Sequence, residues 1–329
     1  MSTFKHAFRI AALAAIPMAL LQAAPALAQA TKTVEVLAIV EHPALDAIRD
    51  GAKAELKAEG FTDTGAGKNL KWEYQSAQGS TATAAQIARK FIGDKPDAIV
   101  AIATPSAQAV VAATKSIPVV YSGVTDPVAA QLVKSWEPTG TNVTGVSDKL
   151  PLDKQIALIK RVVPAARRVG MVYNPGEANS VVVVEELKKL LPAAGLTLVT
   201  SAAPRTVDIA PAAKNLIGKV DVIYTNTDNN VVSAYESLVK VANEAKIPLV
   251  AGDTDSVKRG AIAALGINYY KLGQQTGKVV ARILKGEKPG AIASAGSTDL
   301  ELFVNEGAAK KQGATLSADL LKDAKEVIK

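Results

Sequence analysis

The chain has 329 residues, a formal charge of +7 and no cysteine. The missing cysteines exclude disulfides, a thiolate nucleophile, a thiolate metal site and a lipidated cysteine at a signal cleavage point. The modest positive charge is spread over helix faces, and no helix-turn-helix segment or basic stripe with interleaved aromatics is visible, so we expect no nucleic-acid partner.

Residues 1–30 are predicted to be a secretory signal peptide. Two basic residues precede an apolar stretch over 10–21, and small-residue cleavage sites end at Ala28 or Ala30. The apolar stretch is shorter than the roughly twenty residues that a membrane span needs. We therefore expect a periplasmic protein that is secreted and not lipid-anchored.

The first half of the mature chain alternates predicted strands and helices. Strands are expected over 34–40, 70–76 and 98–103, and helices over 43–60 and 81–91. The stretch 98–103 is apolar throughout, which is typical of a strand buried on both faces of a parallel sheet.

The second half repeats this alternation. Strands are expected over 168–173, 196–201, 220–224, 248–251 and 261–267, and helices over 180–191, 207–217, 229–245 and 272–284. The tail, 301–329, is expected to add one strand and two short helices. The pattern predicts parallel sheets with right-handed crossovers.

A repeated phrase indicates two similar lobes. Lys95-Pro-Asp97 followed by Ile117-Pro118 returns as Lys219-Val-Asp221 followed by Ile247-Pro248. The fold class is therefore predicted as α/β, with two doubly wound parallel-sheet lobes. We assign lobe 1 to 31–146 plus about 256–293 and lobe 2 to 147–255 plus about 294–329, with later crossings near 252–257 and 293–299.

Polar loops follow the buried strands of the first half. Thr104 and Pro105 begin a predicted helix, whose free amides attract anions, although Thr104 could serve only as the helix cap. Ser122 and Thr125 offer further donors, and Asp126 is expected to cap the next helix. A ligand carboxylate suits this edge of the first lobe.

The second half offers comparable loops. Asn174, Asn179 and Ser180 follow one strand, with helix capping as the plainer interpretation of the last two. The run 225–230 holds six consecutive hydrogen-bonding side chains, more than one cap requires. Asp253 follows the next strand, where a buried carboxylate would pair with a ligand ammonium.

Few of the motifs that an enzyme would need are present in the sequence. The stretch 65–69 resembles a phosphate loop but lacks its first glycine and its Ser/Thr, and no dinucleotide-binding or nucleophile-elbow motif is present. His42 is the sole histidine of the mature chain and cannot supply both a base and a metal cluster. A hydrolase using Asp228 and Asp253 remains a distant alternative.

Four stretches carry a resemblance to a known family: 101–108, 122–127, 172–180 and 253–260. They resemble the ABC-transporter substrate-binding proteins that include the tryptophan/tyrosine-binding component, and the resemblance covers essentially the whole mature chain. It implies the type I periplasmic binding-protein fold with a hinge of several strands.

The resemblance also implies roles for individual residues. The ligand carboxylate is expected at Thr104, Ser106, Ser122 and Thr125. The ammonium is expected at Asp253, with Asp228 as rival. Asn174, Asn179, Ser180 and Asn226 would close over the ligand from the far side, and Tyr173, Tyr224 and His42 are candidates for side-chain packing.

The implied function is capture of an amino acid, aromatic ones favoured, by closure of two lobes around it. A monomer would deliver the ligand to a membrane permease powered by a separate ATPase, with no cofactor, no metal and no reaction. Another small polar ligand, such as a sugar, nucleobase or carboxylate, is the alternative, and an extracytoplasmic enzyme is a third.

Overall fold

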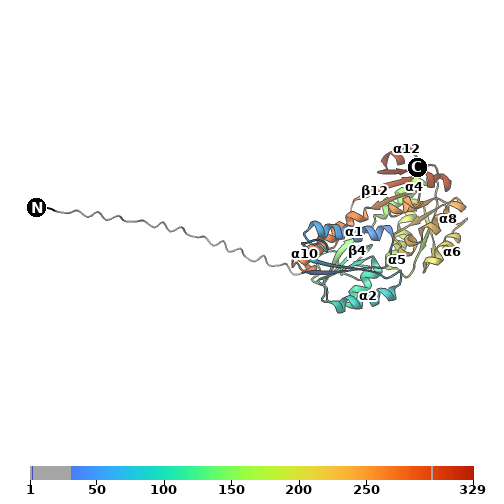
Figure 1. Ribbon diagram of the computed structural model, residues 1–329. Coiled ribbons are helices and arrows are strands. Elements are labelled where there is room, and N and C mark those ends of the chain that lie inside the picture. Colours follow the sequence, from blue (N-terminus) through green and yellow to red (C-terminus); the bar gives the residue numbers. More distant parts are fainter. Residues whose placement is uncertain (1, 3–30, 298) are drawn as a thin grey trace. The chain divides into compact units, whose positions relative to one another are not determined.

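The computed structural model describes residues 31–297 and 299–329, together with Ser2 (Figure 1). The signal peptide predicted for residues 1–30 lies, Ser2 apart, outside the described residues. Within the described part, none of the helices combines the length and the apolar character that crossing a membrane requires.

The first lobe is built on a parallel sheet of six strands in the order β11-β5-β4-β3-β1-β2. Its strands are β1 (Lys32–Ala38), β2 (Leu70–Ser76), β3 (Ala98–Ile102), β4 (Val119–Val124), β5 (Val143–Ser147) and β11 (Ala295–Gly296). Strands β3, β4 and β5 are buried along their whole length, as expected where helices cover both faces of a sheet.

Two pairs of helices cover this sheet. Helices α1 (Pro43–Ala58) and α10 (Tyr269–Leu284) pack against each other on one face, and α2 (Thr81–Asp94) and α3 (Thr104–Ala113) lie together on the other (Figure 1). Helix α10 comes from far along the chain, so the first lobe combines two distant parts of the sequence.

The second lobe is built on a sheet of seven strands in the order β13-β12-β10-β9-β8-β6-β7. Its strands are β6 (Arg168–Tyr173), β7 (Thr197–Ala202), β8 (Val222–Thr225), β9 (Leu249–Ala251), β10 (Ala263–Ile267), β12 (Leu300–Asn305) and β13 (Glu326–Ile328). Neighbours are parallel except β10 and β12, which pair antiparallel.

Shorter helices surround the second sheet. They are α4 (Leu152–Val162), α5 (Ala178–Leu190), α6 (Ile209–Lys214), α7 (Asn229–Ser233), α8 (Tyr235–Ala245), α9 (Asp255–Lys258), α11 (Glu306–Lys311) and α12 (Ala318–Asp323). The predicted α/β class with two doubly wound sheets is confirmed, apart from the antiparallel pair at one position of the second sheet.

The second passage between the lobes lies later than predicted. Strand β10 pairs with β9, so the chain remains in the second sheet through Ile267 and returns to the first lobe only with α10. The assignment of residues 256–267 to the first lobe is therefore corrected. The polar loop over 252–257 is an ordinary strand-to-helix turn, and β10 simply extends the sheet beyond it.

Several element bounds also differ from the sequence prediction. The helix expected over 229–245 is interrupted at Ala234, which separates α7 from α8. The helix expected at Pro127 is replaced by turns, in which the Asp126 carboxylate accepts hydrogen bonds from the amides of Val128 and Ala129. The tail contains a second strand, β13, beside β12.

Glycines hold α1 and α10 in close contact. A Cβ on Gly273 would collide with the carbonyl oxygen of Ile48, and a Cβ on Gly51 would collide with the carbonyl oxygen of Tyr270. The two helix backbones therefore approach more closely than any side chain at these positions would permit.

One carboxylate in the first lobe is buried away from any ligand cavity. Glu35 of β1 is inaccessible to solvent, and neither of its carboxylate oxygens has a hydrogen-bond partner in the described part. Glu73 and Asp94 lie beside it, paired with Lys71 and Lys90 at 2.7 and 2.6 Å. Burial, followed by the nearby Asp94, raises the pKa of Glu35 to about 7.

Glu35→Gln is expected to stabilise the protein at high pH. A raised pKa means that the folded state holds the proton more tightly than the unfolded chain, so stability falls as pH rises from about 4.5 to about 7. Glutamine removes that loss. The thermal midpoint of the variant should exceed that of the wild type at pH 8 and match it near pH 4.5, and equal midpoints at both pH values would contradict this account.

Candidate functional site

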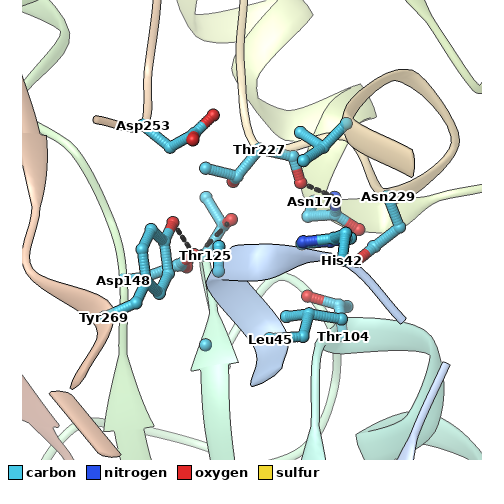
Figure 2. Close-up of a pocket in the computed structure, with 13 residues that line it drawn as sticks. His42, Leu45, Thr104, Thr125, Asp148, Asn179, Thr227, Asn229, Asp253 and Tyr269 are labelled. Carbon is cyan, nitrogen blue, oxygen red and sulfur yellow. Dashed lines mark hydrogen bonds between the residues drawn. The ribbon is translucent and has the colours of Figure 1, made fainter. Parts of the chain in front are cut away.

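A cavity lies where the edges of the two sheets that hold the carboxyl ends of the strands face each other (Figure 2). Residues from both lobes line it: His42, Ala44, Leu45, Thr104, Gly123, Thr125, Asp148, Asn179, Thr227, Asn229, Val232, Asp253 and Tyr269. In open α/β sheets, this edge is where ligands bind.

One end of the cavity is acidic. Asp148 follows β5, and its carboxylate accepts hydrogen bonds from the hydroxyls of Tyr269 at 3.0 Å and Thr125 at 3.3 Å. Asp253 follows β9 and accepts bonds from the amide and hydroxyl of Ser256 at 2.8 and 2.6 Å. Burial raises the pKa of both carboxyl groups. A cation placed between them would restore the ionised forms.

Beside Leu45 and His42, the cavity presents a free hydroxyl at a helix start (Figure 2). Thr104 is the first residue of α3, and Ala103 before it adopts a positive φ of 73°. The Thr104 hydroxyl is buried, lacks a hydrogen-bond partner in the described part and lines the cavity. The alternative that Thr104 only caps the helix is therefore wrong, because it lies inside the helix and its hydroxyl caps nothing.

The opposite end combines apolar walls with an imidazole and two amides. Ala44, Leu45 and Val232 supply the apolar surface. His42, Asn179 and Asn229 line the same cavity and lie on the same side of it as Leu45 (Figure 2). Burial, followed by the positive charge of Arg259, lowers the pKa of His42 to about 4, so the imidazole is neutral near pH 7. Its Nδ1 has no hydrogen-bond partner in the described part.

Five of the thirteen residues predicted as ligand contacts reach this cavity. They are His42, Thr104, Thr125, Asn179 and Asp253. Together they come from both lobes, so the structure joins the acidic residue of the second lobe to the hydroxyls of the first, as the sequence pattern of strand followed by polar loop indicates.

Six others lie within the lobes, outside the lining of this cavity. Ser122 exchanges a hydrogen bond of 2.6 Å with Thr276 of α10, and Ser106 is buried within α3, where its hydroxyl has no hydrogen-bond partner in the described part. Ser180 donates to Asp228 at 2.6 Å, and Asp228 also accepts from the amides of Asn174 and Val231, which makes it the cap of α7. The structure therefore does not bring these residues to the cavity.

Asn174 and Tyr173 complete that group. The Asn174 side chain accepts from the amide of Gly176 and donates to Glu177, so it shapes its own turn. Tyr173 packs, half-buried, against the core of the second lobe. Neither residue lines the cavity.

The last two predicted residues, Tyr224 and Asn226, line a neighbouring cavity. It shares Thr125, Asp148 and Thr227 with the first cavity. The hydroxyl of Tyr224 and Oδ1 of Asn226 are buried without hydrogen-bond partners in the described part.

Sequence reasoning missed Asp148 and Tyr269. Asp148 follows a buried strand just as Asp253 does, but that strand, over 143–147, was not predicted because the boundary between the lobes was placed there. Tyr269 begins α10, and no local pattern indicates that this helix lies beside β5. Thr227 and Asn229 belong to the polar run that was expected to line the cleft.

A lysine bridges the two lobes at the rim. The Lys149 ammonium lies 3.0 Å from the Asp126 carboxylate of the first lobe and 2.8 Å from Glu186 of α5 in the second. All three side chains are partly exposed, so each ion pair contributes modestly to closure, about 0–1 kcal/mol, and is screened by salt.

Two doubly wound lobes, three chain passages between them and a polar cavity at their facing edges define a two-lobed ligand-binding protein. The sequence model of the family described as ABC transporter substrate binding protein matches residues 33–328. The chain belongs to this family, whose members work outside the cytoplasm as the ligand-capturing components of importers.

Two named relatives support this family assignment. The chain is 40% identical over 292 residues to a tyrosine-binding protein of Clostridioides difficile, a match that covers 88% of this chain and 84% of that protein. It is also similar to the crystal structure of an ABC domain from Streptococcus pneumoniae in complex with L-Trp, with 34% identity, a TM-score of 0.87 and coverage of 91% of this chain and 100% of the other.

A third comparison identifies the conformation. The ligand-free, open structure of a substrate-binding protein from Clostridium difficile is 41% identical and covers 91% of this chain and 99% of its own, yet its TM-score is only 0.68. The L-Trp complex, although less similar in sequence, superimposes better. The arrangement of the lobes is therefore more similar to that in the L-Trp complex than to that in the open structure.

Proposed function

We propose that this protein binds an aromatic L-α-amino acid in the cavity between its lobes and delivers it to the permease of an ABC importer. The observation that carries the proposal is the set of groups that line the cavity, with two buried carboxylates on one side and a free hydroxyl, a neutral imidazole and apolar side chains on the other. This set provides partners for an ammonium, a carboxylate and a side chain.

The ammonium would lie between Asp148 and Asp253. Two buried carboxylates with raised pKa values and no lysine or arginine in the cavity lining present an uncompensated acidic site. A bound ammonium supplies the missing charge and hydrogen-bond donors, which is the condition under which buried carboxylates are stabilised.

The carboxylate would bind at the Thr104 hydroxyl and the start of α3. Strands β5, β4 and β3 are adjacent, so Asp148 and Thr104 are separated by two strand spacings, roughly 9–10 Å along the edge. The α-ammonium and α-carboxylate of one amino acid, each with a hydrogen bond to the protein, span such a gap. The free amides of α3 add a favourable dipole interaction of about 0.3–1 kcal/mol.

The side chain would then extend toward Ala44, Leu45 and Val232, beside the His42 ring. These apolar groups suit an aromatic ring, and the neutral imidazole of His42 can pack against it without the cost of burying a charge. The names of the relatives, one tyrosine-binding and one solved with L-Trp, support the same ligand class.

Closure of the lobes would signal the loaded state to the permease. Ligand groups contacted from both lobes stabilise the closed arrangement, with Lys149 bridging the rim. We propose a monomer, free in the periplasm without a lipid anchor, that releases its ligand chemically unchanged.

A ligand screen tests the proposal. Residues 31–329 should gain several degrees in thermal midpoint with L-tyrosine or L-tryptophan at a hundred times the dissociation constant, because such binding adds about 2.7 kcal/mol of stability. Common sugars, nucleobases and simple carboxylates should leave the midpoint unchanged. A shift with one of these and none with aromatic amino acids would overturn the assignment, and turnover of a bound ligand would show an enzyme.

A further inference from the structure

Glu177 lies directly behind the amide end of the cavity without lining it. It is almost fully buried just before α5, and burial, followed by the nearby carboxylate of Asp228, raises the pKa of Glu177 to about 7. Burying a carboxylate is unfavourable unless hydrogen bonds compensate for the lost water, so the partners of Glu177 must be identified.

The hydrogen bonds of Glu177 provide that reason. Its Oε2 accepts from the side-chain amino group of Asn229 at 2.5 Å and from that of Asn179 at 3.1 Å. The backbone amide of Asn229 donates to the same oxygen at 3.2 Å, and Asn174 donates to Oε1 at 3.3 Å. Every one of these partners is a donor, so the carboxylate acts only as an acceptor.

This arrangement fixes which way the asparagines point. The amino group of Asn179 also donates to the carbonyl oxygen of Thr227 at 3.3 Å, so the nitrogen is fully engaged on the protein side. The carbonyl oxygen Oδ1 of Asn179 is consequently left buried and without a partner in the described part, while the residue lines the cavity. A buried acceptor without a protein partner is costly, and a donor group on a ligand in the cavity would satisfy it.

Resting on the function proposed above, we propose that Glu177 is a positioning residue that turns the Asn179 carbonyl oxygen toward the ligand. It thereby selects aromatic amino acids whose side chain donates a hydrogen bond. The phenol of tyrosine and the indole N–H of tryptophan can donate to this oxygen, whereas phenylalanine cannot. The unpartnered Nδ1 of His42 and the Leu45 side chain lie at the same end of the cavity, beside the predicted path of the ring.

Glu177→Leu tests the proposal. Leucine removes the carboxylate oxygen that accepts from both Asn179 and Asn229, so the Asn179 amide loses the acceptor that fixes its orientation and can offer its N–H to the cavity. Titration calorimetry with L-tyrosine and L-phenylalanine should show that the wild type prefers tyrosine by about 10- to 100-fold, the usual effect of a buried polar group left unpaired. In Glu177→Leu this preference should largely disappear, chiefly through weaker tyrosine binding.

A second variant tests the acceptor itself, and a control variant tests for unspecific effects of changing a carboxylate on α5. Asn179→Leu removes the acceptor at similar volume and should also abolish the preference, while improving phenylalanine binding. Glu185→Gln changes an exposed carboxylate on the same helix and should retain the wild-type ratio. Thermal midpoints of all variants check that they are folded.

The outcomes separate this inference from the proposed function. Equal binding of tyrosine and phenylalanine by the wild type would overturn the role of Glu177 alone, as would an unchanged preference in both variants. Failure of the folded wild type to bind any aromatic amino acid would overturn the proposed function and this inference together.

Discussion

Asp148→Asn is expected to weaken binding of an aromatic amino acid by about 100-fold or more, because leaving a buried ligand ammonium without its charged partner costs about 2–5 kcal/mol. The same change should leave the ligand-free protein at least as stable as the wild type at pH 7. Burial raises the pKa of Asp148, so its ionised form disfavours folding, and asparagine removes that cost. Calorimetric titration and the thermal midpoint without ligand measure the two effects separately.

The pH dependence of wild-type binding follows from the same residues. Since the carboxyl groups of Asp148 and Asp253 have raised pKa values, acidification protonates them first in the ligand-free protein, and affinity for an ammonium should fall as pH falls. Asp153→Asn, an exposed change on α4, is the matched control and should bind as the wild type does. An Asp148→Asn protein with unchanged affinity would remove Asp148 from the site.

Gly273→Ala is expected to destabilise the protein by about 2–4 kcal/mol, a large effect for one methyl group. The added Cβ would collide with the carbonyl oxygen of Ile48, a backbone atom that cannot move aside without separating α1 from α10. Because Tyr269 begins α10 and donates to Asp148, the variant should also bind its ligand less tightly. Thermal and denaturant unfolding measure the stability loss.

Gly93→Ala supplies the comparison. Gly93 lies in α2, and a methyl group added there would meet no atom within 4 Å, so alanine should be neutral or stabilise the helix by up to about 1 kcal/mol. Similar effects of the two substitutions would show that helix propensity, and not the contact between α1 and α10, governs both positions.

Local patterns predicted some elements to the residue. The strands expected over 70–76 and 168–173 coincide with β2 and β6, although β2 is only partly buried and β6 is largely buried, because turns mark the ends of both strands. The passage between lobes was predicted too early because it depends on which lobe α10 packs against. That choice is made by contacts between residues far apart in sequence, such as Gly273 and Ile48.

The sequence indicated which loops form the site, but it indicated less well which side chains of those loops reach the cavity. Thr125 and Ser122 look equivalent in sequence, but Ser122 lies within β4 and faces Thr276 of α10, whereas Thr125 follows the strand and reaches the cavity. Asp228 and Asp253 also look alike. The first is engaged as a helix cap with three donors, and the second lines the cavity.

The late return of the chain to the first lobe determines the order in which the protein can assemble. The ribosome completes β1 to β5 by Ser147, but α10, which packs on α1 and covers that sheet, ends only at Leu284. The intervening residues build most of the second lobe. One face of the first sheet therefore stays incompletely covered until most of the chain has been synthesised, and its folding depends on closing a very long loop between α1 and α10.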